Sequence, residues 1–420
     1  MKIKGKKWYK LDNGAKIFPS NVTKKDSKVF RFSCELYENI DQQKLQEALN
    51  KTLEEYPIFL SCLKKGLFWY YLETSSVKPV VKEEDTIICD IMDKKLLFRV
   101  SYYKKRINLE VHHALTDGTG TLMFLKSLIS NYLIKKHNIK SKIIVDKTSM
   151  HEKETDSFEK YYKKNKIRNL SKKQKAFNLK GEFYPENRLK VIEGIASTKK
   201  VLNIAKKYNT TVTVYLVSIL IKSIGLTMSI KEKRKPVVIT VPVNLRKYFK
   251  SNTIRNFFNT ISIEYKFEND NDDLKQIIKN VDKQFKEKLE LENLNIQMNS
   301  FAVLENIFII RLVPVFIKDV VLKYFHKRSR KEQTIALSNV GIVEMPEELQ
   351  KYIKLFDVMT STDCTQMCMC SYLDNMALSF TTHFIDSEIE KNFFQELSKN
   401  DISITINTNI VEDDDYEEVL

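Results

Sequence analysis

The sequence is poor in glycine and proline, with 9 and 8 of these residues among 420. Long flexible linkers depend on such residues, so loosely tethered domains are not expected. The sequence also lacks any uncharged apolar run of about 18 residues, the length that a bilayer-spanning helix needs. The nearest segment, Ile307 to Phe325, is interrupted by Arg311, Pro314, Lys318 and Asp319. We therefore expect closely packed units and no spanning helix.

Cysteine is also scarce, and six residues are too few for a disulfide framework in a chain of this length. Cys364, Cys368 and Cys370 are clustered, but no second pair and no suitably spaced histidine completes a metal-ligand pattern. We interpret them as reduced cysteines in a strand and predict no metal site. The basic N-terminus, Met1 to Trp8, leads into no apolar stretch, so no secretory signal is indicated and a cytoplasmic location is expected.

Acidic residues are outnumbered, because 54 Asp and Glu face 70 Lys and Arg, for a net charge of +16. Six of the acids lie in the last ten residues, Val411 to Leu420. Excess positive charge favours anionic partners such as phosphorylated cofactors, nucleic acid or a membrane surface. A composition rich in lysine throughout is the alternative explanation. No nucleic-acid-binding motif accompanies the charge, so nucleic-acid binding is not predicted.

Hydrophobic periodicity in the first half predicts a mixture of strands and helices. An apolar stretch over Phe30 to Tyr37 predicts a strand. Asp41 can cap the following helix, whose apolar residues recur at helical spacing until Pro57. Two hairpins are expected within 58–73 and 96–111, and a further helix over Thr121 to Lys135.

The segment Lys160 to Lys180 contains nine Lys or Arg and no acid, and we interpret it as a crossover between two halves. The second half again mixes elements, with strands expected at 189–195, 236–243 and 259–267. Two short strand pieces are expected on either side of Ser338 to Gly341. Hairpins and crossovers together predict an α/β chain with mixed sheets rather than a doubly wound parallel fold. We predict two domains, residues 1–180 and 181–420.

One segment carries the residues best suited to chemistry. An apolar strand delivers His112 and His113 to its end, and a short loop with Asp117 and Gly118 leads into the helix. Neighbouring side chains at a strand end point in opposite directions, so one imidazole can face a channel while the other packs inward. An imidazole can accept a proton from a hydroxyl near neutral pH. Asp117 lies at a tight turn that Gly118 permits, and it can fix the loop either by accepting backbone N–H groups or by pairing with a distant arginine.

The pattern His112-His113-x-x-x-Asp117-Gly118 resembles the active-site motif of the chloramphenicol-acetyltransferase-like superfamily, which includes condensation domains and alcohol acetyltransferases. Three further segments resemble that superfamily in the same order along the chain: Leu45 to Trp69, Val241 to Arg246 and Ser338 to Gly341. Within this superfamily, we expect the chain to resemble the stand-alone alcohol acetyltransferase-like proteins of low-GC bacteria.

The resemblance implies two chloramphenicol-acetyltransferase-like subdomains with an active-site channel between them. It implies that His113 is the general base, that His112 has a supporting role, and that Asp117 is structural, with Arg246 as the nominated partner. Acyl-CoA would be the co-substrate and a small alcohol or amine the acceptor, joined in a ternary complex on a monomer. Ser338, Asn339 or backbone near Gly118 would stabilise the oxyanion.

Several alternatives remain open. The donor could be an acyl carrier protein, as in a stand-alone condensation enzyme, or the chain could be a non-catalytic binding protein of the same fold. Coenzyme A phosphates could be bound by Lys160 to Lys180, Arg246 or Lys323 to Lys331. Finally, Ile307 to Phe325 could lie on a membrane and admit a lipid alcohol. A helix buried against the channel is the favoured interpretation of that segment.

Overall fold

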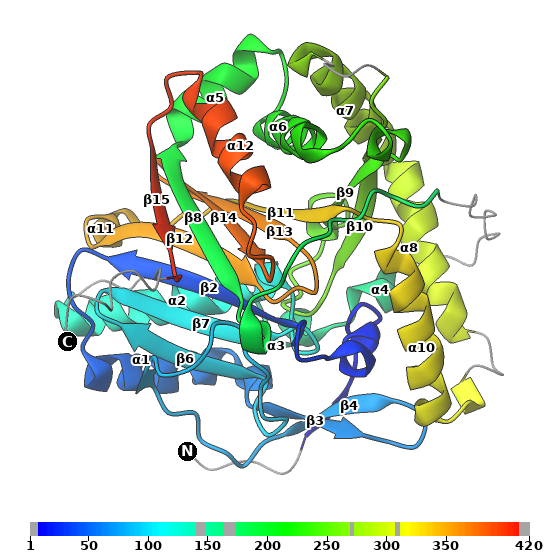
Figure 1. Ribbon diagram of the computed structural model, residues 1–420. Helices are drawn as coiled ribbons and strands as arrows, with labels where there is room; N and C mark the ends of the chain where they lie inside the picture. Colours follow the sequence, from blue (N-terminus) through cyan, green and yellow to red (C-terminus); the bar gives the residue numbers. More distant parts are fainter. Residues whose placement is uncertain (1–6, 140–147, 163–173, 269–272, 307–310, 411–420) are drawn as a thin grey trace.

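The computed structural model describes residues 7–139, 148–162, 174–268, 273–306 and 311–410. Three sheets and the helices that cover them make up the described part of the chain (Figure 1). Most of the predicted crossover Lys160 to Lys180 lies outside the described residues, since 163–173 are among those not described.

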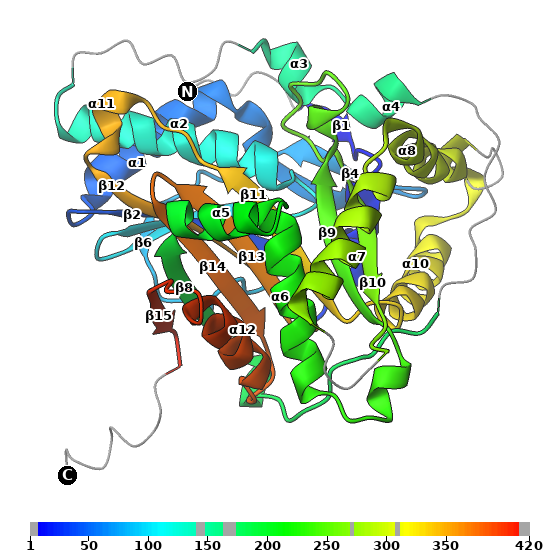
Figure 2. The same cartoon turned by 90° about the horizontal axis from the view of Figure 1, so that it is seen from above.

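The first sheet has five strands in the order β12-β2-β7-β6-β5. All of its neighbouring pairs are antiparallel except β5 and β6, which are parallel. Helices α1 and α2 lie side by side against this sheet (Figure 2). These elements are β2 (Val29–Leu36), β5 (Lys82–Glu83), β6 (Phe98–Tyr103), β7 (Arg106–His112), β12 (Ile353–Thr360), α1 (Gln42–Glu55) and α2 (Gly118–Lys136).

The second sheet has seven strands in the order β10-β9-β11-β13-β14-β8-β15, and β11 runs parallel to both of its neighbours. Helices α5, α6, α7 and α12 gather on one side of it (Figure 1). These elements are β8 (Lys190–Ser197), β9 (Val237–Asn244), β10 (Phe258–Tyr265), β11 (Ile335–Ile342), β13 (Gln366–Tyr372), β14 (Asn375–Thr382), β15 (Ile404–Thr408), α5 (Thr198–Lys207), α6 (Val212–Thr227), α7 (Leu274–Lys288) and α12 (Glu388–Ser398).

A small sheet, β1-β4-β3, and several helices complete the described chain. The strands are β1 (Trp8–Lys10), β3 (Ser61–Lys65) and β4 (Tyr70–Thr74), and the helices include α3 (Met150–Glu154), α4 (Ser157–Tyr161), α8 (Leu291–Asn306), α10 (Val315–Arg330) and α11 (Glu347–Gln350). Within the described residues no single helix is long and apolar enough to span a bilayer, and only α5 and α6 taken together, bent by 83°, meet that requirement.

The two halves of the chain are interlocked by β12. This strand comes from the second half but pairs antiparallel with β2, from Ile353 opposite Leu36 to Thr360 opposite Phe30. Its neighbours in the sequence, β11 and β13, belong to the second sheet. The core of the first half therefore also includes second-half residues such as Val343 and Leu349, and one strand of the second half completes the first sheet.

Local sequence explains many of the element boundaries. The Asp41 side chain accepts a hydrogen bond from the Lys44 backbone N–H at 3.0 Å and caps α1. The α1 residues at helical spacing, including Leu45, Leu49 and Leu53, are buried against the core. Pro57 starts the short 3-10 helix that follows. The mixed parallel and antiparallel sheets confirm the predicted α/β class.

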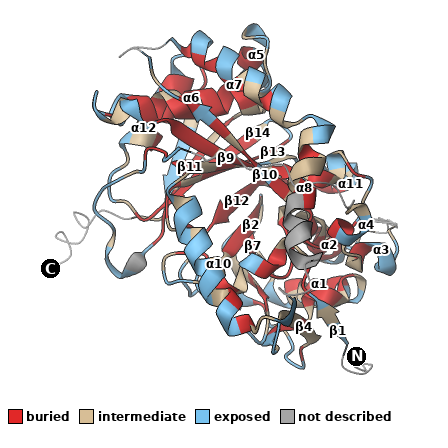
Figure 3. Ribbon diagram, turned by 90° about the vertical axis from the view of Figure 1, so that its right-hand side faces the viewer, coloured by how far each residue is buried: buried red, intermediate tan, exposed pale blue. Residues whose placement is uncertain are grey.

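Two predictions about strands and helices were wrong. The strand pieces expected around Ser338 to Gly341 are one continuous strand, β11, because a bulge at Asn339 and Gly341 absorbs the irregular backbone, with Gly341 at φ +90°. The buried helix favoured for Ile307 to Phe325 is not found in its described part. Helix α10 lies on the outside of the molecule, with most of its residues exposed (Figure 3).

Candidate functional site

The two histidines lie at the end of β7, where the chain turns toward α2. His112 is the last residue of the strand, and the Leu115 N–H donates to its carbonyl at 2.9 Å to close a turn. His113 is the first residue of that turn, and its N–H donates to the Lys28 carbonyl at 2.9 Å. Backbone hydrogen bonds therefore fix the main chain of both histidines on the scaffold of the first sheet.

The His112 imidazole packs within the turn and hydrogen-bonds to its backbone. Its side chain is buried, and Nδ1 accepts a hydrogen bond from the Ala114 N–H at 3.0 Å, so the ring proton resides on Nε2. Burial, with the neighbouring His113 and two lysines, lowers the pKa of His112 to about 3. A neutral imidazole in this position shapes the loop.

The His113 imidazole is half-buried in an aromatic box. Phe18 stacks on the ring with centroids 4.5 Å apart and planes at 15°, and Phe30 and Phe258 flank it at 4.5 and 5.9 Å. Burial lowers the pKa of His113 to about 4, although the charge of Asp117 opposes this shift. The ring is therefore neutral at pH 7 and can accept a proton.

Asp117 caps α2 and joins it to the loop that precedes β10. Its carboxylate accepts hydrogen bonds from the N–H groups of Thr119 and Gly120, both at 3.1 Å, and from the Phe257 N–H at 2.8 Å. A negative charge at a helix N-terminus is stabilised by the exposed N–H groups there. Asp117 thus fixes the conformation of the loop that carries His113.

Arg246 lies opposite Asp117 in a bidentate ion pair. Its Nη1 and Nη2 atoms donate to the two carboxylate oxygens at 2.8 and 3.2 Å. The same guanidinium donates to the carbonyls of Thr253 at 2.8 Å and Phe257 at 3.3 Å, and to that of Arg255. These contacts occupy the Arg246 guanidinium, which disfavours Arg246 as a ligand of a coenzyme A phosphate.

The glycines of this loop have different roles from those expected. Gly118 is the first residue of α2 and has no positive φ, and an added Cβ would meet only Phe32 at 3.6 Å or more. The expectation that Gly118 permits a tight turn is therefore wrong. At Gly120 a Cβ would lie 2.0 Å from the Ile254 carbonyl oxygen and 2.2 Å from Thr116 Oγ1. Close approach of two backbones requires glycine at that position.

Asn256 and Asp12 were missed by the sequence reasoning. Asn256 donates from Nδ2 to the His113 carbonyl at 3.0 Å and to an Asp12 carboxylate oxygen at 3.2 Å. Asp12 is fully buried, and burial raises its pKa to about 6 even though Arg255 opposes the shift. Nδ1 of His113 and Oδ1 of Asn256 are both buried without a hydrogen-bond partner among the described residues.

Ser338 and Asn339 lie in the middle of β11. Ser338 accepts a hydrogen bond from the Gln366 side chain at 3.3 Å. The Asn339 side chain donates to Thr213 at 2.7 Å and accepts from the Gly341 N–H at 2.8 Å. Across the described ranges, neither side chain hydrogen-bonds the loop from His112 to Gly118.

A cavity of about 530 Å³ lies where the two halves meet. Its walls come from both halves of the chain, and its lining does not include His112 or His113. Charged side chains line much of it: Arg31, Glu35, Glu84, Lys104, Lys105, Arg106, Glu193 and Lys354.

The three clustered cysteines lie in or beside β13, buried and without disulfides. The thiols of Cys364 and Cys370 donate to the carbonyls of Thr334 and Phe356 at 3.0 and 2.9 Å. Cys368 and Cys370 lie in a strand, as predicted, whereas Cys364 precedes it.

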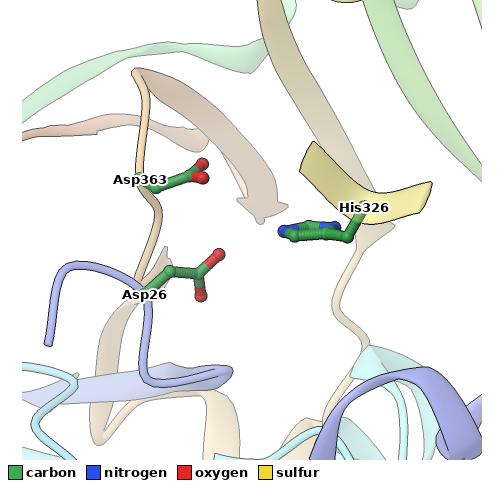
Figure 4. A group of neighbouring side chains, drawn as sticks. All are labelled: Asp26, His326 and Asp363. Carbon is green, nitrogen blue, oxygen red and sulfur yellow. The ribbon is translucent and has the colours of Figure 1, made fainter. Parts of the chain in front are cut away.

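A different group has the composition of a metal site. Asp26, His326 and Asp363 each place one ligand atom within 4.8 Å of the others (Figure 4). However, the Lys28 ammonium contacts Asp26 and lies 3.5 Å from His326 Nε2, and Arg330 pairs with Asp363 at 2.7 Å. Two cations already balance the carboxylates, which disfavours a metal ion there.

The sequence matches no family model and no curated protein. Solved structures are similar over nearly the whole chain. A trichothecene 15-O-acetyltransferase from Fusarium sporotrichioides is 12% identical, with 95% of this chain and 96% of that chain covered and a TM-score of 0.60. The first condensation domain of the calcium-dependent antibiotic synthetase is 11% identical, with 94% and 96% covered and a TM-score of 0.61.

A third structure, TRI101 from F. sporotrichioides in complex with coenzyme A and T-2, is 10% identical, with 95% and 99% covered and a TM-score of 0.58. At such identities the likeness shows the fold. The chain has the mixed-sheet α/β fold shared by these acetyltransferases and condensation domains, as the sequence predicted.

Proposed function

We propose that the chain is an acyltransferase that moves an acyl group from acyl-CoA to an alcohol, with His113 as the general base. The observation that carries the proposal is a neutral imidazole, held in an aromatic box on a loop that the Arg246–Asp117 pair fixes. A base of this kind can take a hydroxyl proton without itself forming a covalent intermediate. The fold shared with a 15-O-acetyltransferase supports this reaction class.

The reaction balances without a further reactant. His113 accepts the proton of the acceptor hydroxyl as its oxygen attacks the thioester carbonyl carbon. The tetrahedral oxyanion then collapses, the carbon–sulfur bond breaks, and the proton passes from the imidazole to the leaving thiolate. The products are the ester and free coenzyme A. Holding both substrates beside the ring provides much of the rate enhancement.

The remaining residues orient this base. His112 shapes the turn, and Asp117 with Arg246 fixes the start of α2. We further propose that Asn256 Oδ1 accepts the Nδ1 proton of His113 during turnover, which leaves Nε2 free to receive the substrate proton. Both buried atoms have no other partner among the described residues, which supports this pairing.

We propose that the group that stabilises the oxyanion lies either on β11 or in the backbone near Gly118. Both amide atoms of Asn339 already bond Thr213 and Gly341, so Ser338 is the better side-chain candidate. We expect the protein to act as a monomer, because the proposed residues all belong to one chain.

The proposal is tested by offering acyl-CoAs with alcohols and amines and measuring the release of free thiol. We expect acceptor-dependent release that falls by about 10²–10⁴-fold in His113→Ala. The control is His151→Ala, which removes an exposed histidine on α3. Release that survives His113→Ala would exclude the role of His113.

The donor and product classes are separated in the same experiment. Turnover with an acyl carrier protein thioester but with no free acyl-CoA would favour a condensation-type enzyme, and the similar condensation domain keeps that alternative open. Formation of an amide instead of an ester would show that the acceptor is an amine and not an alcohol. No turnover with any donor, together with tight substrate binding, would favour a binding protein.

A further inference from the structure

Helix α10 has the reverse of the usual polarity for a helix on a globular protein. Its sequence forms an apolar stripe at helical spacing, but that stripe faces outward and the polar residues contact the protein body. Only Val315 and Lys318 are buried in this 16-residue helix. An ordinary surface helix buries its apolar stripe and exposes its polar face.

The first half of the helix is held to the body by charged groups. Lys318 Nζ donates to the Phe68 carbonyl at 3.0 Å and lies 3.5 Å from the centroid of the Trp69 ring. Asp319 accepts hydrogen bonds from Ser20 at 2.6 Å and Tyr70 at 3.0 Å. These contacts fix which side of the helix faces inward.

The second half of the helix is held in the same way. Inward-facing His326 lies near Asp26 (Figure 4) and beside Lys28, and Arg330 pairs with Asp363. Burial and the Lys28 charge lower the pKa of His326, which keeps the ring neutral among these cations. Polar anchors at both ends thus prevent rotation of the helix about its axis.

Because the polar anchors face inward, the apolar side chains of α10 face outward. Its large side chains are 43–67% exposed, with Val320 at 67%, Tyr324 at 64% and Phe316 at 61%. The Val315 N–H donates to the Leu67 carbonyl at 2.8 Å, so the tip of the β3–β4 hairpin adjoins this face with Leu67 69% exposed. We call the following residues the α10 face: Leu67, Phe316, Ile317, Val320, Val321, Tyr324 and Phe325.

Basic residues border the C-terminal half of the α10 face, and the helix itself carries no exposed acid. Lys323, Lys327, Arg328 and Lys331 are all exposed on or just after α10. Its single acidic residue, Asp319, is engaged inward. A contiguous apolar surface bordered by lysine and arginine complements an anionic bilayer, since the apolar side chains enter the acyl boundary and the cations meet lipid headgroups.

We propose that the α10 face binds a membrane surface that carries anionic lipids. The polar anchors make this mode of binding specific, because burying the stripe against the protein would require breaking the contacts of Lys318, Asp319 and Arg330. A partner protein or a second copy of the chain would need to match both the apolar stripe and the dense positive charge. An anionic bilayer meets both requirements without a shaped partner.

Sedimentation of the full chain with vesicles tests this surface. We expect binding to vesicles of equal parts phosphatidylcholine and phosphatidylglycerol, weaker binding to phosphatidylcholine alone, and loss of binding as salt is raised. The double variant Val320→Glu/Tyr324→Glu should lower the partition coefficient by about tenfold or more. Lys327→Glu/Arg328→Glu should abolish the preference for phosphatidylglycerol.

The matched control is Ile230→Glu, which adds a carboxylate at a side chain that is 73% exposed and lies outside α10. It should bind vesicles like the parent chain. Unchanged thermal unfolding of each variant is the check that all of them fold. Absence of vesicle binding, or binding that the α10 variants leave unchanged, overturns the proposal. The proposal is also overturned if the chain binds no vesicles but forms a dimer, and Val320→Glu/Tyr324→Glu converts that dimer to a monomer.

Discussion

Arg246 and Asp117 are 129 residues apart in the sequence, yet their side chains form two hydrogen bonds at 2.8 and 3.2 Å. One residue belongs to the N-terminus of α2 and the other to the turn after β9. The pair therefore joins the loop that carries His113 to the second half of the chain. Both side chains are nearly buried, so water cannot replace either partner of the ion pair.

Replacing Arg246 with methionine should destabilise the protein strongly. The change leaves the Asp117 carboxylate buried beside three backbone N–H groups but without its cation, which costs about 3–5 kcal/mol. Urea unfolding measures the loss. Arg234→Met, in an exposed turn, is the control and should change stability little. A loss below about 1 kcal/mol, the range of a surface ion pair, would contradict this account.

Gly120 and Gly118 should respond oppositely to alanine. Gly120→Ala drives a methyl group into the Ile254 carbonyl, so we expect a loss of about 1–3 kcal/mol in the free energy of unfolding. Gly118→Ala meets only the Phe32 ring at ordinary contact distance and should be tolerated. The two variants form a matched pair in a thermal unfolding experiment. Equal losses for both would show that the Ile254 contact is unimportant.

The acid limb of the pH–rate profile should lie near pH 4 rather than near 6.5. His113 works as a base only when neutral, so activity is present above its pKa and is lost as pH falls through about 4. The profile of kcat/KM measures this value for the free enzyme. A limb at about 6.5 would mean that the imidazole is hydrated and is not enclosed by the aromatic rings of Phe18, Phe30 and Phe258.

Asn256→Ala should lower kcat more than it changes KM. The asparagine contacts His113 through its carbonyl and raises the pKa of the ring, so its loss should misplace the base and move the acid limb to lower pH. We expect a fall of about tenfold to a hundredfold in kcat. Asn252→Ala, an exposed neighbour, serves as the control. A rate loss with an unmoved acid limb would assign Asn256 a purely structural role.

Local patterns predicted much of the fold and part of the candidate site. Asp41, Pro57 and the spacing of leucines in α1 depend on neighbours a few residues away, so the sequence could indicate them. Arg246 could be nominated as the partner of Asp117 because the resemblance implied an arginine there, and because a buried carboxylate needs a cation. The motif at His112 to Gly118 could be recognised because strand, loop and helix are consecutive.

The parts that escaped prediction depend on distant contacts. Phe18 reaches His113 from the N-terminal segment, and Asn256 connects His113 to Asp12 across both halves. No periodicity in one sequence encodes such pairings. The outward orientation of α10 was also missed, because its stripe alone cannot tell which side faces the protein. Contacts such as that between Asp319 and Ser20 decide this.

The pairing of β12 with β2 has a consequence for biosynthesis. As the chain leaves the ribosome, β2 can pair with β7 early, but its other edge stays open until Ile353 to Thr360 have been made. An open strand edge can pair with the wrong chain, and closing so long a loop is slow. The nascent chain is therefore exposed to misassembly for most of its synthesis. A fragment that ends before β12 should aggregate rather than fold.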